Sequence, residues 1–385
     1  MSFTIDEVFL TQVLSEMVQI DSSNPSLTPG SAGEAEIAGY VANIFEQIGL
    51  DVRTHEVEPG RMNVVGILKG SGKGRSLMLN GHLDTVSFEG MAEPLSGAIR
   101  DGKLYGRGSQ DMKSGIAAMI AAAKALVDAD ITLGGDLLLT AVADEEYASI
   151  GTADIVKHYT ADAAIITEPT DFTICQAHRG FIWYEIETIG RAAHGSRYNE
   201  GVDAIMHMGR FLAELDKLEQ ELRQRPPHPL VNVPSLHASL IKGGTEISVY
   251  PARCVLQVER RTVPGETEAQ VTKELQDIID KLSAADPTFK ATLKQFLERS
   301  PFEIGDDAEI IRVTQDACMK RLGRTAPQVG ASYWTDAAFL ADAGIDCILL
   351  GASGQGLHSD EEWVDVQSVI DLAYILTDTT INFCN

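Results

Sequence analysis

The sequence predicts an α/β fold with a discontinuous main domain, in which helices flank a mostly parallel sheet, and an inserted α+β domain. Apolar strand-like runs alternate with helical stretches up to about residue 170, which is typical of βαβ units. Between about residues 175 and 291 this pattern changes, and the α/β alternation then returns. At 385 residues the chain also exceeds a single ordinary core, so two domains are expected.

The first part of the chain supplies most elements of the main domain. Helices are predicted over residues 5–19, 32–48 and 114–128. Apolar strands are predicted to begin at Ser76, Asp136 and Ala163, and each ends in polar or acidic residues. Strands that alternate with helices in this way favour a parallel sheet.

The insert is predicted to have the order βαββαβ, as in ferredoxin-like domains. A strand over residues 183–189 leads to a long helix over 202–223, which the stretch RPPHP at 225–229 ends. The remaining elements are strands near 237–242 and 254–262, a charged helix over 266–283, and a last strand over 289–296.

After the insert the chain returns to the main domain. A helix is predicted over residues 308–321, a strand over 347–350, and a final helix from Val366. The expected division is therefore residues 1–175 with 292–385 for the main domain, and 176–291 for the insert.

The charge of the chain argues against nucleic acid as a partner. The formal net charge is −25, whereas nucleic-acid binding depends on Lys and Arg that neutralise phosphates. An acidic, solvated surface that keeps the protein soluble is the simpler explanation.

The sequence also predicts a cytoplasmic protein without a membrane segment. No Lys or Arg precedes Arg53, which excludes an ordinary signal peptide. The longest apolar run, residues 115–123, is far short of the roughly 20 residues that span a membrane. Five scattered cysteines suggest neither a disulfide framework nor a thiolate zinc cluster.

Imidazole and carboxylate side chains follow the predicted strands. In SLMLNGHLDTV, residues 76–86, His82 and Asp84 are two positions apart and project to one face of an extended chain. A metal-bound histidine usually donates its other N–H to a carboxylate or carbonyl. Asp84 is therefore placed to hold the His82 ring.

Four further stretches have the same character. In YGRGSQDMKSG a glycine-rich turn puts Asp111 before a helix, where a carboxylate can span two cations. DLLLTAVADEEY ends in three consecutive acids, among them Glu145 and Glu146, whose repulsion a cation would relieve. Glu168 ends the strand in AAIITEPT, and His358 follows a glycine-rich loop in GASGQGLHSDEEWV.

Taken singly, each of these side chains could equally be an ordinary solvated loop residue or a helix cap. Together they fall at strand ends, where ligand sites collect in open α/β sheets. Imidazole and oxygen ligands without cysteine suit zinc, cobalt or manganese, and a paired site needs about five or six protein ligands. The sequence therefore predicts a hydrolase with two divalent metal ions, zinc first and cobalt as the alternative.

The stretches GHLDTV, GRGSQDMKSG, ADEEY, TEPT and HSDEEWV resemble the motifs of the M20 metallopeptidases. That group includes acetylornithine deacetylase, succinyl-diaminopimelate desuccinylase, aminoacylase and glutamate carboxypeptidase. The resemblance covers nearly the whole chain. It implies that the main domain is catalytic and that the insert is a lid that commonly dimerises, so a homodimer is expected.

The resemblance also implies a metal-ligand set. His82 and Glu168 would bind one metal ion, and Glu146 and His358 would bind the other. Asp111 would bridge the two ions, with a cis peptide bond after it. Because His358 lies beyond the insert and the other four before it, the catalytic domain must be discontinuous.

The catalytic roles that the resemblance implies fall on three residues. Glu145 would be the general base and acid, taking a proton from a hydroxide shared by the metals and giving it to the leaving nitrogen. Asp84 would stand behind the metal-bound histidine. His194, in the stretch TIGRAAHGSRYNEGVDA, would stabilise the oxyanion, in its own subunit or in a partner's. Without the resemblance, a hydrogen-bonded turn histidine is the simpler reading of His194.

Two arginines are candidates for binding the substrate. Arg261, in ERRTVPGE, resembles the arginine that grips a substrate carboxylate, a task that suits a bidentate guanidinium. A surface ion pair with Glu259 is the alternative. Arg179, in HRGF, is a second candidate. Ser248 and Glu259 depart from the usual motif residues and weaken an assignment to acetylornithine or succinyl-diaminopimelate.

Three functions remain open from the sequence. The first is hydrolysis of an N-acyl amino acid by a deacetylase-like or desuccinylase-like enzyme. The second is a carboxypeptidase or dipeptidase that acts on short peptides. The third is an inactive metal-binding or partner-binding protein, against which the presence of Glu145 beside every ligand argues.

Overall fold

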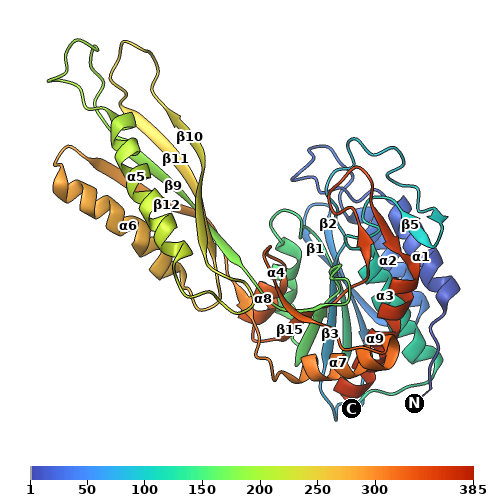
Figure 1. Cartoon of the computed structure of the whole chain (residues 1–385). Helices are drawn as coiled ribbons and strands as arrows, with labels where there is room; N and C mark the ends of the chain where they lie inside the picture. Colours follow the sequence, from blue (N-terminus) through green and yellow to red (C-terminus); the bar gives the residue numbers. More distant parts are fainter. Residues whose placement is uncertain (1) are drawn as a thin grey trace. The chain divides into compact units, whose positions relative to one another are not determined.

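The computed structural model describes residues 2–385 and divides them into two compact units (Figure 1). The first unit runs up to Gln176 and continues over Ile304–Val329 and Thr335–Asn385. The second comprises Ala177–Glu303 and Gly330–Trp334. The return to the first unit thus lies after residue 303 and not, as expected, after residue 291. The reason is that the last strand of the insert continues beyond that point, to Arg299.

The first unit is built on a mixed sheet with a parallel centre. Its strands lie in the order β1, β2, β6, β3, β7, β15 and β8. The central four, β6, β3, β7 and β15, run parallel. The bounds are β1 Asp51–Glu58, β2 Arg61–Leu68, β3 Leu77–His82, β6 Leu137–Val142, β7 Ala163–Ile166, β8 Ile174–His178 and β15 Asp346–Leu349.

Helices cover this sheet. Every residue of β3 and β6 is buried, although successive side chains point to opposite faces, so both faces are covered. The helices are α1 Glu7–Gln19, α2 Ala35–Gln47, α3 Lys113–Asp128, α4 Ile150–His158, α7 Glu309–Leu322, α8 Ala337–Asp342 and α9 Val366–Cys384. The run of small apolar residues in α3 is almost wholly buried, and α3 packs against α1 and α9.

The edge of the sheet differs from the predicted βαβ order. Two helices open the chain, and β1 and β2 then form an antiparallel hairpin. Its turn contains Gly60 at φ +78°, a conformation that glycine adopts without steric cost. A small second sheet in this unit has the order β16 Gly354–Gln355, β17 Trp363–Asp365, β5 Lys103–Tyr105 and β4 Ile99–Arg100.

The second unit has the chain order βαββαβ. Its four-stranded antiparallel sheet has the order β10, β11, β9 and β12, and α5 and α6 pack on it around one hydrophobic core (Figure 1). The bounds are β9 Gly180–Ile189, α5 Ala204–Arg223, β10 Ser235–Gly243, β11 Arg253–Thr262, α6 Glu268–Ala285 and β12 Lys290–Arg299. Residues of β9 and β11 alternate between buried and partly exposed, as expected when only one face is covered.

Short strands complete the chain: β13 Phe302–Glu303, which pairs with the end of β8, and β14 Gln328–Ala331. The five cysteines are buried, and none of them forms a disulfide bond within residues 2–385. Within residues 2–385, no helix combines the length and the apolar character that crossing a membrane requires.

Candidate metal centre

The parallel strands bring three of the five predicted ligands to one edge of the sheet, whereas Asp111 lies just before α3 and His358 lies between β16 and β17. His82 is the last residue of β3 and lies in register with Val142, the last residue of β6. Glu145 and Glu146 lie three and four residues beyond the end of β6, and Glu168 lies two residues beyond the end of β7. Because parallel strands end at the same edge, side chains far apart in sequence meet there.

Five side chains form two groups that could hold metal ions. In the first, His82 Nε2 lies 3.2 Å from Asp111 Oδ1 and 3.7 Å from Glu168 Oε1. In the second, His358 Nε2 lies 3.2 Å from Glu146 Oε2 and 3.4 Å from Asp111 Oδ2. Asp111 thus directs one carboxylate oxygen into each group. The peptide bond between it and Met112 is cis, as the resemblance implied.

Burial disfavours the negative charge of three acidic side chains around the two groups. Burial, together with the charge of Glu168, raises the pKa of Glu145 well above its ordinary value. Burial also raises the pKa of Glu168 itself and of Glu146. Oε1 of Glu146 is buried and receives no hydrogen bond within residues 2–385. Carboxylates in such surroundings need protons or cations to offset their charge.

The two histidines carry the compensating protons in the absence of metal. Burial opposes a charge on His82, but its hydrogen bonds to Asp111 and Asp84 outweigh that effect and raise its pKa well above the ordinary value. Hydrogen bonds to Asp111 and Glu146 raise the pKa of His358 to about 10. Since imidazole binds a metal only when neutral, a metal ion would displace these protons. The donor set therefore fits two divalent cations.

Asp84 faces the His82 ring with both its main-chain carbonyl and its carboxylate. The ring nitrogen Nδ1 of His82 lies 2.9 Å from the main-chain oxygen of Asp84 and 3.5 Å from its carboxylate. The carboxylate also accepts hydrogen bonds from the backbone N–H groups of Glu145 and Glu146, at 3.1 and 3.2 Å, and from the side-chain amide of Asn24 at 2.7 Å. Asp84 therefore orients the His82 ring through its carbonyl and fixes the acidic loop through its carboxylate.

A buried network behind this loop was not apparent from the sequence. Arg61 donates two hydrogen bonds of 2.6 Å to Glu34 and one of 2.7 Å to Asp144. Asp144 also accepts from Asn24 and has a left-handed backbone, with φ +69°. Asn24 and Arg61 lie in stretches without any acidic or histidine motif, so no sequence signal marked them.

Glu362 holds the loop that carries Asp111. One oxygen of Glu362 accepts the backbone N–H groups of Gln110 and Asp111, at 2.8 and 3.0 Å. The other accepts from Gly108 at 3.1 Å and from Arg107 at 2.7 Å. Its only signal in the sequence was its place in the stretch HSDEEWV, four residues after His358.

The remaining predicted site residues lie in the second unit. His194 is exposed, and its Nδ1 lies 2.8 Å from the Ser196 hydroxyl. Arg179 donates two hydrogen bonds, of 2.9 and 2.7 Å, to the carbonyl of Val231. Arg261 pairs with Glu259, the ion pair that the sequence left open as the alternative.

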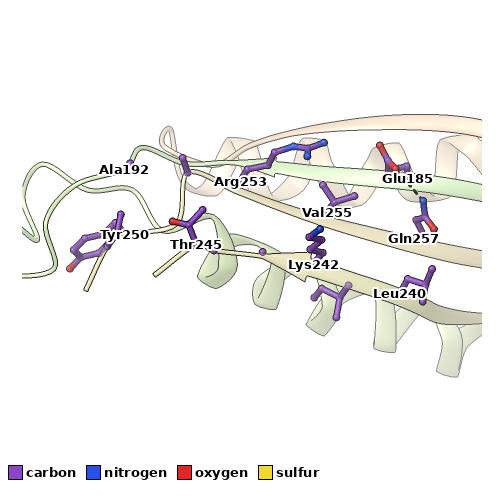
Figure 2. A pocket seen from close by; sticks show the side chains of 14 residues that line it. Glu185, Ala192, Leu240, Lys242, Thr245, Tyr250, Arg253, Val255 and Gln257 are labelled. Atoms are coloured by element: carbon purple, nitrogen blue, oxygen red, sulfur yellow. Dashed lines mark hydrogen bonds between the residues drawn. The ribbon is translucent and has the colours of Figure 1, made fainter. Parts of the chain in front are cut away.

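A cavity of about 740 Å³ also lies in the second unit, beside β10 and β11 (Figure 2). Most of its lining surface is apolar, and Gln257 donates a 3.2 Å hydrogen bond to Glu185. None of the predicted site residues is among the described residues that line it.

Comparisons with known proteins find relatives over most of the chain. The family model described as Peptidase family M20/M25/M40 matches residues 78–382. N-formyl-4-amino-5-aminomethyl-2-methylpyrimidine deformylase of Bacillus subtilis (strain 168) is 29% identical, over 93% of this chain and 91% of its own. Acetylornithine deacetylase of Myxococcus xanthus is 29% identical, over 97% of each chain.

Solved structures share the fold over almost the full length. Aminopeptidase PepT from Bacillus cereus ATCC 10987 aligns with a TM-score of 0.81 at 20% identity, covering 99% of this chain and 100% of its own. Bacillus subtilis YXEP protein, described as a dinuclear metal binding peptidase, aligns with a TM-score of 0.74 at 15% identity, covering 98% of each chain. At these identities the similarity shows the fold alone.

Proposed function

Because this chain belongs to peptidase family M20/M25/M40 and is a metal-dependent hydrolase of amide bonds, we propose that it deacylates an N-acyl amino acid with two metal ions. The observation that carries the proposal is the division of one carboxylate, Asp111, between two ligand groups. A single-metal site has no need of a ligand so placed.

The ligand assignment follows the two groups. His82 and Glu168 would hold one ion, Glu146 and His358 the other, and Asp111 both. Histidine and carboxylate donors without thiolate suit zinc, with cobalt as the alternative. When bound, two such ions lower the pKa of a water molecule and polarise the scissile carbonyl.

Glu145 is the proposed proton carrier. It follows the strand that ends beside the ligands, and its backbone N–H is fixed by Asp84 at 3.1 Å. Burial raises its pKa, so it holds a proton more readily than an exposed carboxylate, as suits a group that takes a proton from water and returns it to the leaving nitrogen. His194 is proposed to donate to the oxyanion, a role that its exposed ring leaves available.

A test of this function combines metal content with turnover. Metal-free protein is loaded with zinc or cobalt and assayed on N-acetyl, N-formyl and N-succinyl amino acids and on dipeptides. We expect two ions at this centre and release of an amino acid that stops after chelation. Full loading with activity on dipeptides alone would favour the peptidase alternative. Loading without turnover on any substrate would favour a binding protein.

A second candidate substrate is an acylated amine with a planar ring and no carboxylate. The arginine expected to grip a carboxylate, Arg261, is already paired with Glu259 and lies over the Phe181 ring at 5.1 Å. Aromatic rings gather around it, with Phe181 5.4 Å from Trp183 and 6.4 Å from Trp334. One relative is named for the deformylation of such an amine, N-formyl-4-amino-5-aminomethyl-2-methylpyrimidine.

The Arg261→Gln variant distinguishes the two substrates. If a substrate carboxylate displaces Glu259, the variant raises KM for N-acyl amino acids by about tenfold or more and leaves the formylated pyrimidine unaffected. Arg253→Gln on the same strand, which removes an exposed ion pair with Glu187, is the matched control. Unchanged KM for every N-acyl amino acid would remove Arg261 from the substrate site.

We also propose that the second unit forms a homodimer. β10 is an edge strand, and its Leu240 and Ile241 are 65% and 57% exposed. An apolar exposed edge favours pairing with another chain. In sedimentation the wild type is expected as a dimer and the variant with Leu240→Lys and Ile241→Lys as a monomer. Thr292→Lys, on the opposite edge strand β12, is the control. A stable, fully active wild-type monomer would contradict the proposal.

A further inference from the structure

A second set of convergent ligand atoms lies in the first unit and shares no residue with the metal centre. His55 comes from β1, and Asp154 and His158 from α4. Each offers one ligand atom, and all three atoms lie within 4.8 Å of one another. We propose that these residues form a further metal site, which binds a divalent transition-metal ion, zinc or copper.

The spacing of the atoms suits an ion better than direct contact. Asp154 Oδ1 lies 3.5 Å from His158 Nε2, and Oδ2 lies 3.9 Å from His55 Nδ1. Both distances are too long for hydrogen bonds. A tetrahedral ion with ligands at about 2.0 to 2.1 Å holds neighbouring ligand atoms about 3.3 Å apart, so a small contraction would complete the site. Ligand atoms of the metal centre are separated by similar distances, 3.2 to 3.7 Å.

Tyr159 fixes the ring of His55 in the orientation that metal binding requires. Its hydroxyl lies 2.8 Å from Nε2 of His55. With Nε2 held in this way, the other nitrogen, Nδ1, is the one directed at Asp154. A partner on the second ring nitrogen is the usual companion of a metal-bound histidine, because it sets tautomer and ring direction.

Local structure explains why the three residues meet. Asp154 and His158 are four apart on α4 and therefore lie on one face of the helix. α4 packs against β1, the edge strand of the sheet. The His55 and His158 side chains are 25% and 50% exposed, so an ion can enter from solvent and retain a water ligand. Two imidazoles and one carboxylate form a donor set that suits zinc and copper.

A metal ion at this site would stabilise the position of α4. The helix begins at Ile150, directly after the loop that carries Glu145 and Glu146. Its far end carries His158. An ion bound there would tie this end of α4 to the edge of the sheet.

Copper binding tests the site apart from the metal centre. A background variant with His82→Ala and His358→Ala removes both imidazoles of the metal centre, so imidazole coupling cannot come from there. Its metal-free form is titrated with Cu²⁺ and followed by electron paramagnetic resonance. We expect one tightly bound Cu²⁺ with nitrogen hyperfine coupling from two imidazoles. Adding His158→Ala should abolish this signal, and Tyr159→Phe should weaken binding by about 10- to 100-fold.

His237→Ala is the matched control, because it removes an exposed histidine of β10 in the second unit. Native mass spectrometry of the otherwise unaltered protein in excess zinc should show one ion fewer for His158→Ala than for His237→Ala. Equal zinc content in these two variants, or a copper signal that survives His158→Ala, would overturn the proposal. Since His158 is half-exposed, circular dichroism should show that both variants are folded.

Discussion

Glu145 and Glu146 are neighbours in sequence and yet have different surroundings. An oxygen of Glu146 lies 3.2 Å from His358 Nε2, as two ligands of one ion would. The pKa of Glu145 is raised well above its ordinary value by burial and by the charge of Glu168. Because burial raises the pKa of Glu146 as well, the imidazole beside Glu146 is what distinguishes the proposed metal ligand from the proposed proton carrier.

Glu145→Gln should therefore separate catalysis from metal binding. The amide keeps the size of the side chain but cannot accept a proton, so kcat should fall by about 10²- to 10⁴-fold with metal content unchanged. Glu146→Gln is the paired control, in which the bound metal should also fall. Elemental analysis and steady-state kinetics measure both effects. Wild-type activity in Glu145→Gln would exclude it as the base.

Glu362 supports the site although it is neither a proposed metal ligand nor the proposed base. It is buried and accepts four hydrogen bonds, one of them from the Arg107 guanidinium. Glu362→Gln should lower the free energy of unfolding by about 3 to 5 kcal/mol, because Arg107 loses its buried partner. Metal affinity should also fall, because Glu362 no longer holds the loop that carries Asp111.

The neighbouring Glu361 is exposed, so Glu361→Gln is the control and should change neither quantity. Chemical denaturation and metal titration provide the measurements. Equal stability of the two variants would show that Glu362 does not anchor the loop.

At the scale of elements, the helices were well predicted and the sheet edge was not. The six helices with two predicted ends begin and end within three residues of the prediction, because their apolar periodicity is strong. The hairpin of β1 and β2 was missed. The short helices α4 and α8 were also missed, because they are too brief to show a period. Asp84 was expected to hold His82 by its carboxylate, and a sequence cannot show that the main-chain carbonyl lies nearer to the ring.

The junction of β15 and β7 offers a prediction at this scale. A Cβ on Gly351, just after β15, would lie 1.9 Å from the carbonyl oxygen of Glu168. Gly351→Ala must displace that backbone, so it should lower the free energy of unfolding by about 1 to 3 kcal/mol and weaken metal binding at the group of His82.

Gly39→Ala in α2 is the control, because a Cβ there meets nothing within 4 Å. This variant should be up to about 1 kcal/mol more stable, since alanine favours a helix. Thermal unfolding measures the stability of the Gly351→Ala and Gly39→Ala variants, and metal titration measures their metal affinity. Unaltered metal affinity in Gly351→Ala would show that the position of Glu168 tolerates the shift.

At the scale of the whole molecule, metal binding and pH should be linked. In the metal-free folded state the pKa values of Glu145, Glu168, His82 and His358 are all raised, that of His358 to about 10. A raised folded-state pKa means that the folded protein binds more protons than the unfolded chain. The stability that these protons contribute is present at low pH and is lost as pH rises through the folded pKa values.

Metal ions replace those protons, so the loaded protein should not show this loss. The difference in unfolding temperature between zinc-loaded and metal-free protein should therefore widen as pH rises from about 5 to 9. Differential scanning calorimetry of both forms measures it. His237→Ala, distant in sequence from every ligand, should show the same widening. A difference that is constant or shrinks with pH would contradict the linkage.

The sequence by itself determined the α/β class and singled out five ligand candidates. It could do so because apolar strands that end in acids or histidine are a local pattern, and parallel strands bring such ends together. Only the tertiary structure decided how Asp111 divides its oxygens, which atom of Asp84 meets His82, and that Asn24, Arg61 and Glu362 support the site. It also brought His55 next to Asp154 and His158. These pairings join residues up to about 250 positions apart, and they depend on side-chain directions that only packing fixes.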